Sequence, residues 1–141
     1  MPRSTILVVD DEPVITRTLV LILNNCEGEF TAIGTTQAAE ALAILGGIHP
    51  DLVLLDAIMP GVKGLELALE IRDELGCKVL MMSGQITTGQ LMDGLNASGH
   101  EPFEILVKPV HPTALIERIR EMVHQPPYAS AWKNPLTFRV H

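Results

Sequence analysis

The most constraining feature of the sequence is an unbroken apolar run, residues 52–55, that leads directly into Asp56. A continuous run of branched apolar residues of this length is typical of a strand buried on both faces of a parallel sheet. The Pro60-Gly61 pair that follows indicates a turn. Asp56 is therefore predicted to lie at the carboxyl end of a central strand, where open α/β sheets bind their ligands.

Length and composition limit the class of protein. A chain of 141 residues is expected to form one domain that buries about 70% of its unfolded surface. The apolar fraction is 47% but only 4% is aromatic, which predicts an aliphatic core. No apolar run reaches the ~20 residues of a membrane span, so we expect no membrane insertion. The two cysteines, Cys26 and Cys77, do not suggest a disulfide framework, and a reduced cytoplasmic protein is the expectation.

The net charge of −7 is unevenly distributed along the chain. All 17 acidic residues and all but two of the 10 basic residues lie in residues 1–124. An acidic body argues against direct nucleic-acid binding, which needs a basic surface. It leaves open a protein partner that binds nucleic acid.

Apolar strand patterns alternate with helical patterns along the chain. Helices are expected from Pro13 to Asn24 and over residues 38–45, 64–75 and 112–123. The repetition predicts an α/β fold, a (βα)5 doubly wound five-stranded parallel sheet with helices on both faces. The expected strands are residues 5–9, 30–33, 52–56, 78–82 and 103–107.

The spacing of apolar residues also predicts the inward helix faces. Thr35 or Thr36 is expected to cap the second helix. The inward residues are expected to be Val14, Ile15, Leu19, Ile22 and Leu23 in the first helix, Leu65, Ala68, Leu69 and Leu75 in the third, and Leu115, Ile119, Met122 and Val123 in the last.

Glycines recur every five residues between the fourth and fifth strands, at Gly84, Gly89, Gly94 and Gly99. Each glycine inside a helix costs about 1 kcal/mol relative to alanine. A helix in this segment would be weak, held mostly by tertiary contacts, and able to shift.

The sequence after the last helix differs from the rest. Residues 125–127, Gln-Pro-Pro, end the helix, which predicts a domain over residues 1–124 and an irregular tail over residues 125–141. Tyr128, Trp132 and Phe138 lie in this tail, although disordered tails are usually poor in aromatic residues. The tail is either a linker or frayed end, or a segment that docks on the body or on a second subunit.

Polar residues stand where four of the predicted strands end. Asp10 and Asp11 follow the first strand, Asp56 ends the third, Ser83 follows the fourth and Lys108 follows the fifth. The carboxyl ends of parallel strands meet at one edge of the sheet, so these side chains are expected around one crevice. Each residue alone has a structural explanation, such as favouring a helix N-terminus or neutralising a carboxylate. The complete set is hard to obtain by chance.

The charges in this set predict a metal ion. Two carboxylates about 4 Å apart repel by roughly 4 kcal/mol at an effective dielectric constant of 20. Lys108 supplies one positive charge, and a divalent ion would supply the rest. Oxygen ligands favour Mg²⁺ over zinc, and the five histidines are scattered and expected at the surface.

A carboxylate beside Mg²⁺ and an ammonium group is suited to accept a phosphoryl group, because aspartyl phosphates are established covalent intermediates. We predict that Asp56 is the nucleophile and that Asp11, with Asp10 acting through water, holds the metal. Lys108 is predicted to pair with a phosphate oxygen, and the Ser83 hydroxyl to donate a hydrogen bond to it.

Over about residues 4–124 the chain resembles the receiver domain of two-component response regulators, in the manner of single-domain chemotaxis regulators. The resemblance implies a flavodoxin-like topology with strand order 2-1-3-4-5. It rests on residues 8–13 (VVDDEP), Asp56 with Met59, Pro60 and Gly64, Ser83-Gly84, and Lys108-Pro109.

The resemblance also implies partners and ligands. Asp56 would receive its phosphoryl group from a sensor histidine kinase, a phosphotransfer protein or a small phosphodonor. Mg²⁺ would be held by Asp11, Asp56 and the backbone carbonyl of Ile58, and backbone groups of Ala57 and Gly84 would contact the phosphate. The Lys108-Pro109 bond would be cis. Such a protein assists its own phosphorylation and dephosphorylation and is not an enzyme acting on a separate substrate.

Two positions depart from the family pattern. Ile105 lies three residues before Lys108, where family members commonly have the Tyr or Phe of an aromatic rotamer switch. Phe103 is expected to point to the same sheet face but not to substitute for that switch. Ile58 lies where many members have a polar side chain, and we hypothesise that it slows loss of the phosphoryl group from Asp56.

Output is expected through a downstream protein that contacts the face formed by residues 84–123, and a homodimer is compatible with this. The alternatives are a receiver fragment of a larger regulator and a pseudo-receiver that binds without phosphorylation, which only Ile105 favours. A flavodoxin-like cofactor binder or small phosphatase is a further class. The cofactor binder is disfavoured because the Asp10-Asp11-Glu12-Pro13 turn is not the glycine-rich loop that binds phosphate. The phosphatase is disfavoured because Glu12 is a poor candidate for the second acid that it would need two residues after Asp10.

Overall fold

The computed structural model describes residues 2–84, 89–90, 93, 99 and 101–125. The tail beyond Gln125, with its three aromatic residues, and most of the glycine-spaced segment therefore lie outside the described residues.

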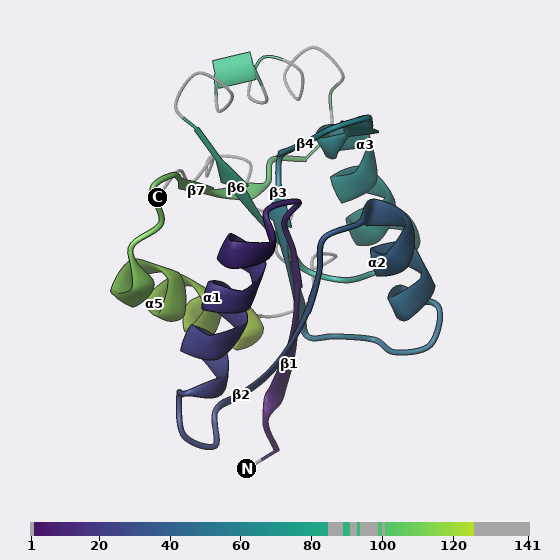
Figure 1. Cartoon of the computed structure of the whole chain (residues 1–141). Coiled ribbons are helices and arrows are strands. Elements are labelled where there is room, and N and C mark those ends of the chain that lie inside the picture. Colours follow the sequence, from purple (N-terminus) through teal and green to yellow (C-terminus); the bar gives the residue numbers. More distant parts are fainter. Residues whose placement is uncertain (1, 85–88, 91–92, 94–98, 100, 126–141) are drawn as a thin grey trace.

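Five parallel strands form the central sheet of the domain (Figure 1). They run in the order β2-β1-β3-β6-β7, which is the predicted order 2-1-3-4-5 counted along this sheet. The α/β fold and its flavodoxin-like topology are thus confirmed. The strands are β1 (Ser4–Val9), β2 (Phe30–Thr35), β3 (Leu52–Asp56), β6 (Val79–Ser83) and β7 (Glu104–Val107).

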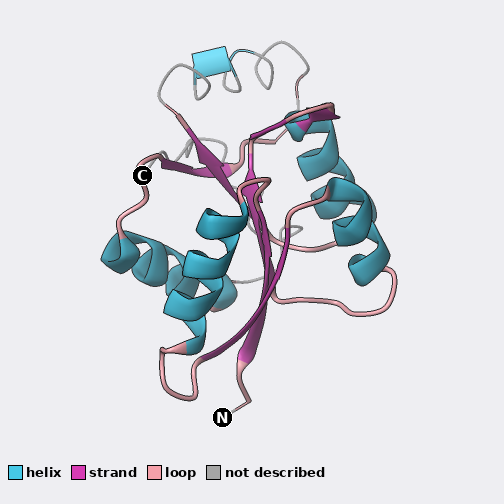
Figure 2. Cartoon of the chain, in the orientation of Figure 1, coloured by secondary structure: helices cyan, strands magenta, loops and turns pink. Residues whose placement is uncertain are grey.

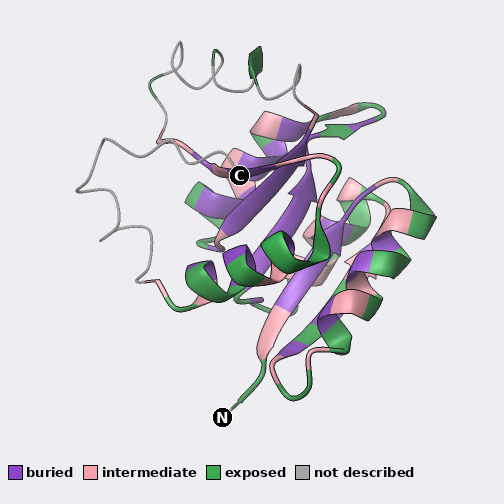
Figure 3. Ribbon diagram, turned by 90° about the vertical axis from the view of Figure 1, so that its left-hand side faces the viewer, coloured by how far each residue is buried: buried purple, intermediate pink, exposed green. Residues whose placement is uncertain are grey.

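Helices cover both faces of this sheet (Figure 2). One face carries α1 (Pro13–Asn24) and α5 (Pro112–Val123). The other carries α2 (Ala38–Leu45), α3 (Gly64–Leu69) and the π-helix η1 (Glu70–Glu74). In Figure 3 the strands are buried between helices whose outer faces are exposed.

The apolar runs are explained by this three-layer arrangement. Successive residues of a strand point to opposite faces, and each face has its own core. In β3, Leu52 and Leu54 pack with α1 and α5, whereas Val53 and Leu55 pack with α2 and α3. All four side chains are fully buried, so no alternation with polar residues is seen. No helix among the described residues is long and apolar enough to cross a membrane.

A short hairpin follows β3 that the sequence did not predict beyond its turn. Strands β4 (Ile58–Met59) and β5 (Val62–Lys63) pair antiparallel around the Pro60-Gly61 turn. Gly61 has a φ of 71°, a backbone conformation that suits glycine. The hairpin connects Asp56 to the first turn of α3.

The predicted helix over residues 64–75 is confirmed as a helical segment to Glu74, but its second half is a π-helix. The chain changes from α-helix to π-helix at Glu70, and Arg72 continues the buried face formed by Leu67, Ala68 and Ile71. Arg72 is buried, donates to the carbonyl oxygens of Glu101 and Pro102 (3.0 and 3.1 Å), and lies over the Phe103 ring. Leu75, predicted to face inward, is instead 38% exposed.

Two details of the other helices also differ from prediction. Val14 does not face inward but is 69% exposed, because Thr16 takes the buried position in the first turns of α1. Neither threonine before α2 is its N-cap, which is Gln37. Thr35 ends β2, and its hydroxyl accepts a hydrogen bond from the Gln37 N–H (3.2 Å). Cys26 and Cys77 are free thiols, as expected.

Candidate functional site

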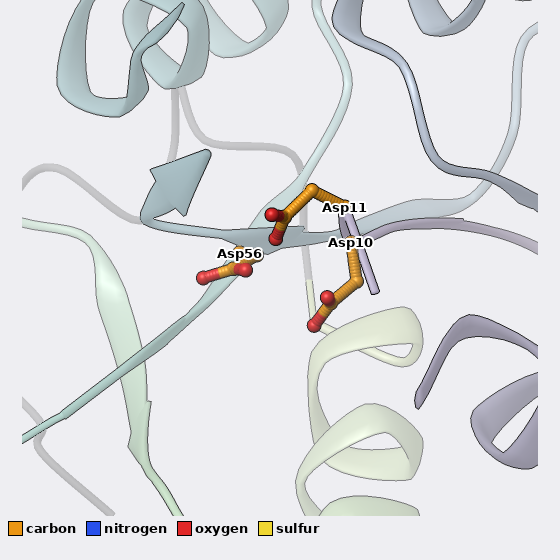
Figure 4. A group of neighbouring side chains, drawn as sticks. All are labelled: Asp10, Asp11 and Asp56. Carbon is orange, nitrogen blue, oxygen red and sulfur yellow. The ribbon is translucent and has the colours of Figure 1, made fainter. Parts of the chain in front are cut away.

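Three carboxylates meet at the carboxyl edge of the sheet (Figure 4). Asp10 and Asp11 follow β1, and Asp56 ends the neighbouring strand β3. Each offers one oxygen that lies within 4.8 Å of the others. The structure therefore brings together the acids that the sequence predicted to converge, although Asp56 lies 45 residues beyond Asp11 in the chain.

Asp10 is the most deeply held of the three acids, with a fully buried side chain. Its Oδ1 accepts a hydrogen bond from the Glu12 N–H at 3.0 Å, and its Oδ2 lies 3.5 Å from Lys108 Nζ. Asp11 is partly exposed. A cation held by these acids would therefore be reached from the Asp11 side, with Asp10 behind it.

Lys108 joins the acids from the end of β7, which is separated from β1 by the two strands β3 and β6. Its ammonium lies 3.3 Å from Asp56 Oδ1 and contacts Asp10 as well. Burial by itself favours the neutral amine, but the neighbouring charges of Asp56 and Asp10 outweigh it, so the pKa of Lys108 is raised. Among the described residues, Lys108 is the cation that pairs with this cluster. The Lys108-Pro109 peptide bond is cis, as expected.

Asp56 is almost completely buried, with 4% of its surface exposed. Burial, with a smaller contribution from the charge of Asp10, raises its pKa to about 6. The Ile58 N–H donates to Asp56 Oδ1 at 3.1 Å and, together with Lys108, opposes this shift. Burial thus disfavours the ionised form of the Asp56 carboxyl, and a change that removes its negative charge is favourable.

Ser83 and Lys108 are brought side by side by the sheet. Strands β6 and β7 pair in parallel, and the Lys108 N–H donates to the Ser83 carbonyl at 2.7 Å. The Ser83 side chain is buried, and its Oγ donates to the Gly84 carbonyl at 2.9 Å. Both residues lie at the sheet edge where Asp56 ends, as the sequence predicted.

The backbone N–H groups of the two residues after Asp56 have different partners. The Ala57 N–H donates to the Met82 carbonyl at 2.9 Å, as part of the sheet, and the N–H that reaches the Asp56 carboxylate belongs to Ile58. The predicted phosphate contact of Ala57 stays a prediction, as does that of Gly84. The Ile58 side chain stands at the surface and is 59% exposed.

Gly64 is a residue whose role the sequence did not explain. A Cβ on Gly64 would lie 2.0 Å from the Ala57 carbonyl oxygen, so α3 begins directly against the chain that leaves Asp56. No side-chain pattern signals such a backbone contact. The glycine lets the hairpin close over the carboxyl edge of β3.

Ile105 occupies the position of the missing aromatic residue. It is fully buried in β7, in register with Met81 of β6. Phe103 packs in the same core, as expected for a residue two positions away, and is held under Arg72 with the guanidinium 4.0 Å from the ring centre. Phe103 therefore lies directly before β7, at the opposite end of that strand from Val107, the residue in register with Ser83.

The donor set suits a hard divalent cation. The three acids offer only oxygen, and a cluster of three carboxylates with one ammonium retains negative charge. Mg²⁺ is commonly bound by one or two carboxylates together with water and phosphate oxygens. The residues present therefore fit Mg²⁺.

Comparison with known proteins agrees with this geometry. The family model for the response regulator receiver domain matches residues 6–120. The DNA-binding response regulator MtrA of Mycolicibacterium smegmatis is 34% identical over 118 residues, which are 84% of this chain and 50% of that protein. The chain thus spans about half the length of the curated relatives it matches.

Solved structures show the same fold. The chemotaxis response regulator CheY4 of Vibrio cholerae superposes with a TM-score of 0.71 at 24% identity, covering 85% of this chain and 98% of CheY4. A CheY-like receiver domain protein from Methanospirillum hungatei is 28% identical, with a TM-score of 0.68 and coverage of 86% and 94%.

Proposed function

The chain belongs to the response regulator receiver domain family, and from this we propose that it is the phosphoacceptor switch of a two-component phosphorelay, with Asp56 as the acceptor. The observation that supports this most directly is the environment of Asp56: a buried carboxyl of raised pKa, 3.3 Å from Lys108 and clustered with Asp10 and Asp11.

The contacts of Asp56 suggest how it would react. Both the Ile58 N–H and Lys108 approach Oδ1, so we assign the attack to Oδ2. This oxygen would form the new bond to phosphorus, and the bond from phosphorus to the donor, a histidine nitrogen or an acyl oxygen, would break. The phosphorylated side chain would keep its contact with Lys108, whose ammonium then faces the phosphoryl oxygens. The Ser83 hydroxyl would turn toward the same oxygens from the end of β6.

Mg²⁺ is part of this proposal because receiver domains typically bind it at their acidic pocket, and the carboxylates present fit it. Asp11 and Asp56, with the Ile58 carbonyl, would hold the ion, and Asp10 would act through water. When bound, the ion would neutralise charge on the phosphoryl oxygens. The site needs a bound cation because Lys108 alone does not neutralise three acidic side chains.

The phosphoryl donor is proposed to be a histidine kinase or a phosphotransfer protein, as membership of the family implies. We propose that the chain serves as acceptor and assists its own phosphorylation and dephosphorylation, without acting on a separate substrate. Output would pass to a downstream protein through the face made by residues 84–123. The alternative, a receiver that works as part of a longer regulator, is favoured by the length of relatives such as MtrA.

Intact-mass measurement after incubation with acetyl phosphate and Mg²⁺ tests the proposal. We expect one phosphoryl adduct on the unmutated chain and none on Asp56→Asn. The matched control is Asp93→Asn, which changes an exposed aspartate and should keep the adduct. Absence of the adduct from the unmutated chain, or its persistence in Asp56→Asn, would overturn the assignment.

A further inference from the structure

A buried threonine on α1 contacts the backbone of the acidic cluster. Thr16 is 7% exposed, and its Oγ1 donates a hydrogen bond to the backbone carbonyl of Asp10 at 2.7 Å. A threonine hydroxyl in a helix usually bonds a carbonyl three or four residues back. Thr18 does this on the exposed side of the same helix, with Val14 as acceptor at 2.7 Å. Thr16 instead reaches six residues back, out of the helix and into the site.

The hydrogen bond from Thr16 adds to the contacts that hold Asp10 in place. The Asp10 N–H donates to the Thr35 carbonyl of β2 at 3.3 Å, and its carboxylate is held by the Glu12 N–H and by Lys108. The carbonyl belongs to the same planar peptide unit as the N–H of Asp11. A hydrogen bond to that carbonyl therefore restricts the direction in which the Asp11 side chain leaves the backbone.

The opposite side of Thr16 is fixed by a glycine on β2. A Cβ on Gly34 would lie 2.6 Å from Thr16 Cγ2 and 2.9 Å from Val20 Cγ2, so α1 packs directly on the β2 backbone. The methyl group of Thr16 fills this contact while its hydroxyl faces Asp10. Because a β-branched side chain is stiff at χ1, packing the methyl group orients the hydroxyl.

We propose that Thr16 is a positioning residue, which holds the Asp10–Asp11 peptide so that both carboxylates face Asp56, and that Gly34 gives it the space to do so. The inference rests on the proposed metal site and adds to it a side chain that touches neither metal nor phosphate. A simpler role, a buried hydroxyl that only stabilises the fold, predicts lower stability with unchanged Mg²⁺ affinity.

The central experiment compares Thr16→Val, which keeps the shape and removes the hydroxyl, with Thr16→Ser, which keeps the hydroxyl. Mg²⁺ affinity is measured by isothermal titration calorimetry. We expect Thr16→Val to weaken Mg²⁺ binding by about tenfold, as loss of a partner that orients a ligand does. Thr16→Ser should stay close to the unmutated chain. Thr18→Val removes the ordinary helix hydroxyl bond on the exposed face and should leave the affinity unchanged.

A second readout needs no metal. In EDTA, the backbone amide resonance of Asp11 should shift in Thr16→Val, since its peptide loses the hydrogen bond at the carbonyl, and should stay in place in Thr18→Val. Phosphorylation of Thr16→Val by acetyl phosphate should recover when Mg²⁺ is raised to saturation, because the chemistry of Asp56 is untouched.

Gly34→Ala approaches the same contact from β2. We expect it to weaken Mg²⁺ binding as well, because the added methyl group meets Thr16 Cγ2. Adding Thr16→Ser removes that Cγ2 and should restore part of the affinity, with the Val20 contact limiting the recovery. If Thr16→Val does not fold, the comparison of Gly34→Ala with the double variant tests the positioning role of Thr16 instead.

The inference is overturned if Thr16→Val binds Mg²⁺ as tightly as the unmutated chain, or if Thr18→Val weakens binding equally. An unmutated chain that neither binds Mg²⁺ nor accepts phosphate would instead refute the proposed function. In that case the Asp11 resonance alone would report whether Thr16 orients the peptide.

Discussion

Replacing Asp56 by asparagine should make the metal-free protein more stable at neutral pH. The Asp56 carboxyl has 4% of its surface exposed, and burial raises its pKa from 3.8 to about 6. The folded chain therefore binds a proton at Asp56 more tightly than the unfolded chain does. Stability contributed by this group is largest below pH 4 and falls as the pH rises toward 6, then levels off.

The magnitude follows from the size of the shift. The pKa of Asp56 differs by about two units between the folded and the unfolded chain, and each unit corresponds to about 1.4 kcal/mol. The free energy of unfolding should therefore fall by roughly 3 kcal/mol between pH 4 and pH 7. Burial is the main cause of the shift, and the charge of Asp10 adds a smaller contribution in the same direction. Asparagine has nearly the same shape and cannot ionise, so Asp56→Asn should lack this loss.

Urea denaturation in EDTA between pH 4.5 and pH 7.5 measures the effect. The free energy of unfolding of Asp56→Asn should exceed that of the unmutated chain by about 2–3 kcal/mol at pH 7.5, and the two should approach each other near pH 4.5. Asp93→Asn, at an exposed position, should follow the unmutated curve. Equal curves for Asp56→Asn and the unmutated chain, or a less stable Asp56→Asn at pH 7.5, would refute the electrostatic account of the site.

Three further substitutions test other parts of the structure. Gly64→Ala should cost about 1–3 kcal/mol or more in urea denaturation, because its Cβ would meet the Ala57 carbonyl at 2.0 Å; Gly89→Ala, where nothing lies within 4 Å, is the control and should cost nothing. Ile58→Asn should shorten the lifetime of the aspartyl phosphate, followed by mass spectrometry, because an exposed polar group beside Asp56 can orient water; an unchanged lifetime counts against the hypothesis. Lys78→Met should speed amide exchange at the C-terminal end of α5, because Lys78 Nζ donates to two carbonyls there at 2.7 and 2.6 Å; unaltered exchange would show that this contact does not hold the helix end.

Much of the site could be predicted because it depends on rules that act along single strands. A strand buried on both faces must be apolar throughout, and its first polar residue then marks where it leaves the sheet. In a parallel sheet those exit points share one edge, so Asp10, Asp56 and Lys108 could be placed together without knowledge of any contact. Strand–helix repetition also predicted the layers, whereas the strand order came from the resemblance to receiver domains.

The remaining features depend on how closely segments approach, which no local pattern encodes. The buried charge of Arg72 is satisfied by the carbonyl oxygens of Glu101 and Pro102, and Thr16 takes a buried position against Gly34. Both outcomes arise from contacts between residues distant in sequence.

The sequence by itself determined the fold class and the set of residues that converge, because hydrophobic periodicity and strand ends are local properties of the chain. Only the tertiary structure decided how those residues are held: the Ile58 N–H on Asp56, the Gly64 backbone against Ala57 and the Thr16 hydroxyl on Asp10. These are short-range interactions whose existence depends on packing distances of a few tenths of an ångström. Packing of whole helices on the sheet sets those distances.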